Sequence, residues 1–340
     1  MSPQAKSFFQ YSFVIIATGG LIWFSLRGLK TTDGENKVEY LVDTWHSANK
    51  GWLLAMALIS VASHIMRAER WRMLLVPAGQ KTRLSYSFLS LMVGYLVNLV
   101  IPRGGEVSRC YNLYKLDKIP ADITFGTVVV ERIVDLACLL ILIALSFVLE
   151  SQKLFAFIDT LAISLSAGNS KLVILAYIAV VSVLAAIGLY WLLKKNRKVN
   201  AFLASMWTGF KGGLGSVFKL DNKWLFVFYS VAIWFLYFLM SYAVIKAFPA
   251  TAELGYQAVI SLFAIGAIAM AAPLPGGTGS YHVLVPQGLV FLYGIPQTDA
   301  VAFTFIFHGW QTAILIAGGA ISLIITTLIV KKKSGLPRQR

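Results

Sequence analysis

Charged residues are scarce in this chain. Asp, Glu, Lys and Arg make up 13% of its 340 residues, whereas hydrophobic residues make up 58%. A soluble domain has about a quarter of its residues charged, because polar groups must cover its surface. The shortage of charge excludes an ordinary water-soluble domain and predicts a surface that faces lipid.

The motifs of several enzyme classes are also missing. The chain has no G-x-x-x-x-G-K-[ST] phosphate loop, which argues against direct ATP hydrolysis. It has no G-x-S-x-G nucleophile elbow either. Its two cysteines, Cys110 and Cys138, belong to no Cys/His cluster with metal-ligand spacing, and we expect no disulfide between them. We therefore expect no recognisable catalytic residue, no metal and no cofactor.

Long apolar runs dominate what is present. A membrane span needs ~20 mostly apolar residues to cross a hydrocarbon core of ~30 Å. Such runs lie at about 8–27, 51–68, 122–149, 171–193, 224–248 and 300–330. The first run lacks the cleavage pattern of a signal peptide, so we interpret it as a retained span. The sequence predicts an all-α polytopic membrane protein with about six full spans. These form a single transmembrane domain over 1–340, without a separate soluble domain.

Basic residues exceed acidic ones and gather in particular loops. The chain has 30 Lys and Arg against 15 Asp and Glu, a net charge of +15. The basic segments are 67–83, 194–223 and 331–340, whereas 28–50 and 249–256 are balanced or acidic. Cytoplasmic loops of membrane proteins carry the excess of Lys and Arg. This pattern favours membrane topology over nucleic-acid binding, and it predicts a multi-pass protein of the plasma (inner) membrane with a cytoplasmic C-terminus.

Two further apolar stretches, 84–101 and 256–295, are interrupted by Pro and Gly. The loop at 103–121 is basic, yet only 84–101 separates it from the basic loop before it. The stretch 256–295 must likewise start and finish outside if the tail is to end inside. Every loop fits if both stretches are re-entrant hairpins, which need surrounding protein or a wet cavity. The alternative is that both cross fully and one basic loop breaks the charge rule.

The segments 51–149 and 224–330 share one order of elements: a span, a hairpin and a span. Their first spans run in opposite directions, which is typical of an inverted-topology repeat with the working site at the repeat interface. Two other stretches are predicted to lie on the membrane surface. The stronger is 199–219, where apolar residues recur at three- and four-residue spacing, and the weaker is 153–167.

Three ionisable residues lie inside an apolar span: Glu131, Arg132 and Asp135. Each charge costs about 2.5–3.5 kcal/mol on insertion scales, so such residues are functional candidates. We assign them to a midplane cavity, with Arg132 able to pair with Asp135 on one helix face. The alternative is a self-satisfied ion cluster that fixes the span to its neighbours.

The turn of the first hairpin offers a candidate site for a lipid head group. Its residues are Arg103, Gly104, Gly105, Glu106 and Arg109. Glycines permit a sharp turn that exposes backbone N–H groups, and arginine binds phosphate in a bidentate manner. A plain cytoplasmic turn with interfacial arginines is the alternative reading.

The second hairpin contains two histidines near a glycine-rich turn. The candidate residues here are Pro275, Gly276, Gly277, Gly279, Tyr281, His282 and His308. A histidine can carry a proton near physiological pH, which would suit a transport pathway. The alternative is that each histidine is a buried, hydrogen-bonded packing residue.

Three ordered motifs carry a resemblance to a known family. They are Pro102-Arg103-Gly104-Gly105-Glu106-Val107-Ser108-Arg109, Val130-Glu131-Arg132-Ile133-Val134-Asp135 and Pro273-Leu274-Pro275-Gly276-Gly277-Thr278-Gly279, with Gly294-Ile295-Pro296 after the last. Over roughly 10–330 the chain resembles the lysylphosphatidylglycerol synthetase transmembrane region, a family of flippase-like integral membrane proteins. The resemblance implies a lipid-handling membrane domain, since some members are thought to move an aminoacylated phospholipid between leaflets and others are tied to polyprenyl-linked sugars.

The sequence departs from the family pattern in two places. His282 stands where a Glu is expected and His308 where an Arg is common, so the resemblance does not fix the head group. The chain ends at Arg340 without a soluble aminoacyl-transferase domain, so we do not expect this chain alone to synthesise lysylphosphatidylglycerol.

Together these patterns predict a flippase-like transporter that binds an anionic phospholipid or a lipid-linked phosphate, and they favour transport over enzymatic activity without deciding between them. Its expected partners are anionic or polyprenyl-linked membrane lipids, with no nucleic acid. Two alternatives stay open. One is a membrane-bound transferase acting on a lipid-linked donor, with Glu106 or Glu131 as base, and the other is a non-catalytic partner of a cell-envelope complex.

Overall fold

The computed structural model describes residues 37–166, 220–272 and 274–334, together with a few positions between 20 and 25. All regular structure in these ranges is helical, which confirms the predicted all-α class. The expected span at 171–193 and the expected surface helix at 199–219 lie outside the described residues, as does most of the expected span at 8–27.

Four of the described helices are long and apolar enough to cross a membrane. They are α3 (Lys50–Leu75), α6 (Ala121–Ser166), α9 (Lys223–Ala247) and α12 (Gln297–Ser334). Large apolar side chains on their outer faces are exposed, for example Leu54 on α3 and Ile324 on α12 at 58% and 61%. An apolar outer surface on long apolar helices is what a protein solvated by lipid requires, and the chain is a membrane protein.

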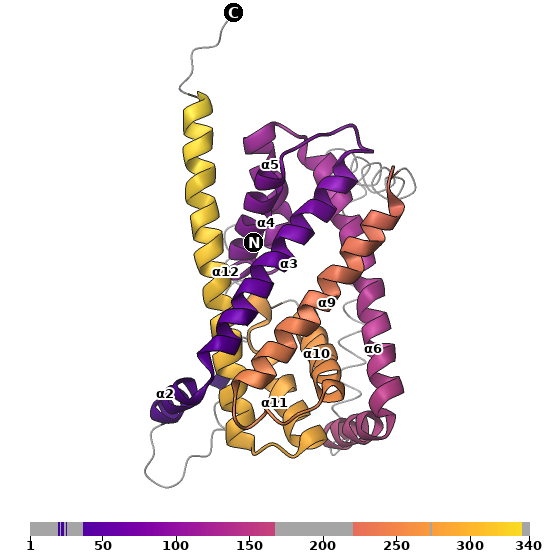
Figure 1. Cartoon of the computed structure of the whole chain (residues 1–340), viewed down its shortest axis with the longest axis vertical. Coiled ribbons are helices and arrows are strands. Elements are labelled where there is room, and N and C mark those ends of the chain that lie inside the picture. Colours follow the sequence, from indigo (N-terminus) through magenta and orange to yellow (C-terminus); the bar gives the residue numbers. More distant parts are fainter. Residues whose placement is uncertain are drawn as a thin grey trace, which may run out of the picture.

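The four long helices lie along the long axis of the molecule: α3 and α12 run toward the upper end, and α6 and α9 run toward the lower end (Figure 1). The upper end, where α12 finishes, holds the end of α3 and the start of α9. The lower end holds the short helix α2 (Lys37–Ser47) and the junction where Asn49 N donates to Ala247 O at 2.7 Å. At the upper end Lys333 Nζ donates to Leu116 O at 2.6 Å.

Two helical hairpins fill the space between the long helices. One consists of α4 (Leu84–Asn98) and α5 (Gly104–Asp117), and the other of α10 (Tyr256–Ala271) and α11 (Ser280–Tyr293). Each helix has 14 to 16 residues, fewer than the ~20 that a full span needs. The first hairpin starts and ends toward the upper end of the bundle, and the second toward the lower end (Figure 1).

The turns of the two hairpins meet inside the bundle. Arg103 Nη2 donates to the carbonyl of Ala271 at 2.8 Å. A Cβ atom placed on Gly276, in the short 3₁₀ turn Pro275–Gly277, would lie 2.8 Å from Cδ2 of Leu99. The hairpin tips, 168 residues apart in sequence at this hydrogen bond, are therefore in direct contact.

Glycines serve different purposes in the two hairpins. In the second turn Gly276, Gly277 and Gly279 all have positive φ, which glycine adopts without steric cost. In the first turn the left-handed residue is Arg103, with φ 62°. Gly105 lies instead against α4, where an added Cβ would come within 2.2 Å of the carbonyl oxygen of Gly94. The helices α4 and α5 thus touch backbone to backbone.

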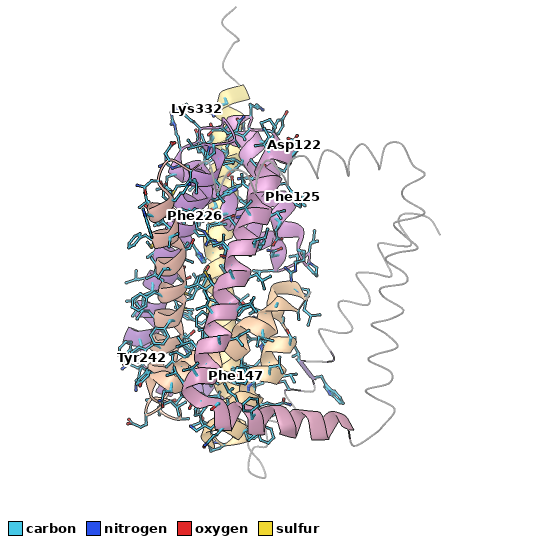
Figure 2. The ribbon with its side chains drawn as sticks, turned by 90° about the vertical axis from the view of Figure 1, so that its right-hand side faces the viewer. Asp122, Phe125, Phe147, Phe226, Tyr242 and Lys332 are labelled. Atoms are coloured by element: carbon cyan, nitrogen blue, oxygen red, sulfur yellow. The ribbon has the colours of Figure 1, made fainter. Side chains whose placement is uncertain are left out.

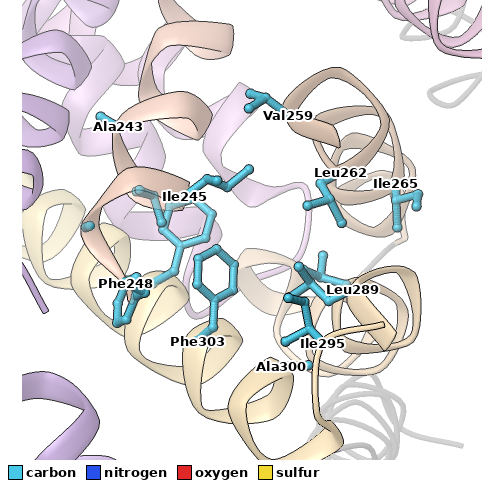
Figure 3. Packing of buried hydrophobic residues seen from close by; sticks show 14 of the residues in the cluster. Ala243, Ile245, Phe248, Val259, Leu262, Ile265, Leu289, Ile295, Ala300 and Phe303 are labelled. Atoms are coloured by element: carbon cyan, nitrogen blue, oxygen red, sulfur yellow. The ribbon is translucent and has the colours of Figure 1, made fainter. Parts of the chain in front are cut away.

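Separate apolar cores hold the two hairpins. The larger core lies between α9, α10, α11 and α12, and Figure 3 shows Phe248, Leu262, Leu289 and Phe303 pointing into it. The rings of Phe248 and Phe303 meet edge to face with centroids 5.1 Å apart. A smaller core near the upper end packs the first hairpin against α3, α6 and α12; its fully buried members include Trp71, Leu75, Leu113 and Leu116.

The helix α6 is kinked at Glu150, whose φ and ψ are −139° and 39°. Beyond the kink the helix turns and runs across the lower end of the molecule (Figure 2), and residues 153–166 of the stretch predicted to lie on the surface, 153–167, fall on this arm. The buried carboxylate of Glu150 accepts hydrogen bonds from Ser261 Oγ at 2.7 Å and from the Tyr293 hydroxyl. Glu150 therefore attaches the end of α6 to both helices of the second hairpin.

Candidate functional site

Charged side chains of three helices meet in the upper half of the bundle. Asp135 on α6 accepts hydrogen bonds from Arg70 at 2.6 Å and from Arg67 at 2.8 Å, both on α3. One turn earlier on α6, Glu131 accepts from Arg109 on α5 at 2.5 Å. The side chains of Arg70 and Glu131 have no exposed surface. The three helices are thus joined by a buried ion network.

The spacing of charges along each helix builds this network. Arg67 and Arg70 are three residues apart on α3, and Glu131 and Asp135 are four apart on α6, so each pair shares one helix face. A buried charge is tolerated only when it is paired and hydrogen-bonded. The ring of Trp71 adds a further contact, since the Arg109 guanidinium lies 4.7 Å from its centre.

The predicted pairing of Arg132 with Asp135 is only a minor contact, at 3.7 Å. The closer partner of Arg132 is Glu106 on α5, at 3.0 Å. The reason is that the two arginines of α3 already occupy the carboxylate of Asp135. Arg132 is 39% exposed and lies at the edge of the network.

Arg67 and Arg70 were assigned from the sequence to a cytoplasmic loop, and the structure corrects this. The apolar run weakens near residue 68, but α3 continues to Leu75 and buries both arginines. A signal was present: the two arginines share a helix face with a following apolar residue, Leu74, and they match in number the two carboxylates on α6.

A cavity of about 470 Å³ lies between the two hairpin turns and the four long helices. Its charged wall has three arginines and two carboxylates, and so a net charge of +1: Arg67, Arg103, Arg132, Glu106 and Asp135. The remaining lining is largely apolar, from α6, α9, α10 and α12. The cavity is partly open, and two of its apolar lining residues, Leu136 and Met270, are 55% and 40% exposed.

The cavity brings together about half of the residues proposed from the sequence. Those that line it are Arg103, Glu106, Arg132, Asp135, Gly276, Gly277, Tyr281 and His308. Those outside its lining are Gly104, Gly105, Arg109, Glu131, Pro275, Gly279 and His282. Arg109 and Glu131 are occupied with each other, so the network has a paired interior and a wall that faces the cavity.

The glycines of the first turn do not offer free N–H groups to a ligand, contrary to the expectation from the sequence. Gly104 N donates to Ile101 O at 2.9 Å, and Gly105 N donates to Asn98 Oδ1 at 2.7 Å. The turn satisfies its own backbone because the helix α5 begins there directly. Anion binding at this turn would therefore rely on side chains.

The two histidines support the turn of the second hairpin. His308 Nε2 is 3.0 Å from Gly276 O, and His282 Nδ1 accepts from Gly279 N at 3.3 Å. Their rings are 4.8 Å apart between centroids. His282 has the contacts of a buried packing residue, as the alternative reading expected, whereas His308 also lines the cavity.

Several cavity-lining residues have a buried polar atom without a hydrogen-bond partner among the described residues. These atoms are His64 Nδ1, Arg67 Nε, Tyr95 Oη, Glu106 Oε2, Arg132 Nε and Trp234 Nε1. Each unpaired atom costs about 1–3 kcal/mol, and such a concentration calls for an explanation. Among all the described residues, no group of three or more His, Cys, Asp or Glu side chains is placed to hold a metal ion.

Comparison with known proteins places the chain. The model of the lysylphosphatidylglycerol synthase transmembrane region matches residues 9–319. The chain belongs to this family. The predicted resemblance is confirmed, and the motifs that carried it stand in three places: at the first hairpin turn, on the charged face of α6 and at the second hairpin turn.

Curated relatives of this family member include two archaeal proteins. A UPF0104 membrane protein of Methanocaldococcus jannaschii is 29% identical over 106 residues, which are 30% of this chain and 30% of the relative. Glycosyltransferase AglD of Haloferax volcanii is 25% identical over 308 residues, which are 82% of this chain and 49% of the relative. The chain thus spans about half the length of AglD and less than a third of the length of the Methanocaldococcus jannaschii protein in these matches. No solved structure matches the chain significantly.

Proposed function

We propose that this protein is a lipid transporter that binds an anionic phospholipid or a lipid-linked phosphate and moves it between leaflets. The observation that supports this most is the two-sided cavity, with a charged wall of net +1 and an apolar wall. A phosphate head group suits the arginines, since guanidinium groups pair with phosphate oxygens. Leu136 and Met270, at the open side, would contact the acyl or prenyl chain where it leaves toward the bilayer.

The proposed topology has the upper end of the bundle in the cytoplasm and the protein in the plasma membrane. Lys115, Lys118 and Lys331 to Lys333 lie at that end, which the positive-inside rule assigns to the cytoplasm. Both hairpins are then re-entrant, one from each side, and 51–149 and 224–330 form an inverted repeat within one transmembrane domain. The short hairpin helices and their meeting tips support this arrangement.

Cysteine labelling tests the topology. Single cysteines at Lys81 and Lys115, in a background with Cys110 and Cys138 replaced by serine, are expected to react only with reagents that enter the cytoplasm. The two positions flank the first hairpin, so a re-entrant hairpin leaves both on one side. Labelling of position 115 from outside the cell, with position 81 still cytoplasmic, would make 84–101 a full span and remove the inverted repeat.

The head-group site can be tested by lipid retention. Arg103→Ala and Arg132→Ala are each expected to weaken binding of anionic lipid by about 1.5–3 kcal/mol, roughly 10- to 150-fold, the value of a hydrogen bond to a charged group. Native mass spectrometry of lipid retained after gentle extraction measures the change. Arg72→Ala is the matched control, because Arg72 pairs with Glu69, also on α3, and neither residue lines the cavity.

Exchange of a fluorescent lipid between leaflets of proteoliposomes tests transport itself. We expect vesicles with the parent or the Arg72→Ala protein to exchange lipid faster than protein-free vesicles. Vesicles with Arg103→Ala or Arg132→Ala should exchange lipid more slowly than the parent, near the protein-free rate. Equal lipid retention in all four proteins would refute the head-group site, and a parent at the protein-free rate would refute transport.

A second candidate function is that of a transferase acting on a lipid-linked donor. It is favoured by the match to Glycosyltransferase AglD and by Glu106, whose Oε2 has no hydrogen-bond partner among the described residues and which could act as a base in the cavity. Incubation with a lipid-linked sugar should then give a new product that Glu106→Gln fails to form. A non-catalytic partner of an envelope complex would show neither product nor exchange, and would co-purify with that complex.

A further inference from the structure

Arg132 is held less firmly than the other three arginines of the ion network. Arg67, Arg70 and Arg109 each donate a hydrogen bond to a carboxylate at 2.5 to 2.8 Å, and at most 8% of their side-chain surface is exposed. Arg132 is 39% exposed, and its nearest carboxylate, that of Glu106, lies 3.0 Å away. Of the four, Arg132 is therefore the arginine that a ligand in the cavity reaches most readily.

The guanidinium of Arg132 is already shared between two carboxylates. Its Nη2 faces Glu106 at 3.0 Å and its Nη1 faces Asp135 at 3.7 Å, while Nε is buried and has no hydrogen-bond partner among the described residues. Asp135 is fixed by its hydrogen bonds from Arg67 and Arg70. Glu106 has no second ion pair within the described residues, and it lines the cavity together with Arg132. Of the two carboxylates, Glu106 is the one that can leave.

We infer that Glu106 is an internal counter-ion of the head-group site, which the lipid phosphate displaces from Arg132 on binding. This rests on the proposed function. Carboxylate and phosphate oxygens both accept hydrogen bonds from a guanidinium, so the two anions compete for the same nitrogen atoms. Their like charges also repel each other at this distance. The buried pair of Arg109 and Glu131 joins the same two helices, α5 and α6, so their packing does not depend on Glu106.

The exchange of counter-ions helps the site to release its lipid. In the empty cavity Glu106 neutralises Arg132, so this guanidinium is not left without a carboxylate. When a phosphate leaves, the carboxylate returns to Arg132, and the affinity for the lipid is lower by the energy of that contact. A transporter needs such a moderate affinity, because cargo that binds too tightly is not released.

Phosphatidic acid and phosphatidylcholine with matched acyl chains test the exchange, because phosphatidic acid presents its phosphate without a further group. Native mass spectrometry of the purified full chain gives the ratio retained. The parent should prefer phosphatidic acid, and Glu106→Gln should raise that preference by roughly two- to fivefold, the value of a partly exposed ion pair. Glu106→Ala should change the preference in the same direction.

Glu69→Gln is the matched control. Glu69 pairs with Arg72, and their exposed fractions of 16% and 41% resemble the 15% and 39% of Glu106 and Arg132. Neither Glu69 nor Arg72 lines the cavity, so the preference of this variant should equal that of the parent.

A double-mutant cycle separates counter-ion exchange from a general effect of charge in the cavity. In an Arg132→Ala background, measured at a higher lipid concentration, Glu106→Gln should have a smaller effect or none, because the guanidinium for which the anions compete is gone. An undiminished gain in that background, or no gain in the parent background, overturns the inference and leaves the proposed function intact. A parent that retains phosphatidic acid no better than phosphatidylcholine overturns both.

Discussion

Replacing Glu131 by leucine is expected to lower the free energy of unfolding by about 3–5 kcal/mol, the cost of breaking a buried ion pair from one side. Glu131 has no exposed side-chain surface and lies 2.5 Å from Arg109, whose side chain is 3% exposed. The substitution leaves that guanidinium buried without a carboxylate partner. Arg70, 3.7 Å from Glu131, loses a second favourable charge at the same time.

Removing both partners should cost far less than removing one. In the double variant Glu131→Leu with Arg109→Leu no unpaired charge remains, and apolar side chains often replace a buried pair at little cost. Thermal unfolding of the purified proteins measures both changes, with Arg72→Leu as a surface control expected to cost less than about 1 kcal/mol. If the double variant is as unstable as the single one, the instability does not come from an unpaired Arg109, and this explanation is wrong.

The same double variant separates structure from transport. Neither Arg109 nor Glu131 lines the cavity, so lipid exchange by the double variant should stay near the parent rate. Loss of exchange in a well-folded double variant would show that Arg109 and Glu131 take part in transport and are not only structural.

A disulfide between the hairpin tips is expected to reduce lipid exchange to the rate of protein-free vesicles. A Cβ on Gly276 would lie 4.0 Å from Cα of Leu99, so the two positions are near enough to attempt a disulfide between Leu99→Cys and Gly276→Cys, whose Cβ atoms must come within about 3.5–4.5 Å. Transporters of inverted repeats work by moving one repeat against the other around a fixed site. A covalent bond between the tips prevents that movement, so the effect on exchange should be near complete.

Reduction of the disulfide supplies the control within one sample. Because Gly276 has φ 56°, a cysteine there is strained, and the single variants report any loss from strain alone. Exchange should return on reduction to the rate of the Gly276→Cys protein. Undiminished exchange by the fully oxidised protein would show that the tips need not separate.

The fold class followed from the sequence because lipid solvation imposes simple rules. Spans must be apolar over ~20 residues, and an irregular backbone must be shielded, so run length and the breaks at Pro102 and Pro275 located the long helices and the hairpin turns. Whether the hairpins are re-entrant stays a prediction. The suggestion of re-entrant hairpins came from loop charge combined with run length. The helices themselves do not show where the membrane begins and ends.

The candidate site followed only in part. The motif glycines and the α6 charges were found because they break an apolar pattern locally. Arg67 and Arg70 were misplaced, since a run of basic residues at the end of a span looks the same whether it continues as helix or as loop. Neutral residues such as Tyr95 gave no signal, because only the packing of α4 beside α3 brings that side chain to the cavity.

The backbone contact of Gly94 with Gly105 has a mechanical consequence. Where two helices touch through side chains, rotamer changes let them slide, but here the two backbones are in contact and an added Cβ on Gly105 would meet the carbonyl oxygen of Gly94 at 2.2 Å. We therefore expect α4 and α5 to move together as one unit. We expect any swing of its tip to be absorbed in the connections on either side of the hairpin, which contain Gly79 (φ 74°) and Lys118 (φ 59°). We expect substitutions that stiffen those two connections to slow movement of the hairpin tip without changing any residue near the tip.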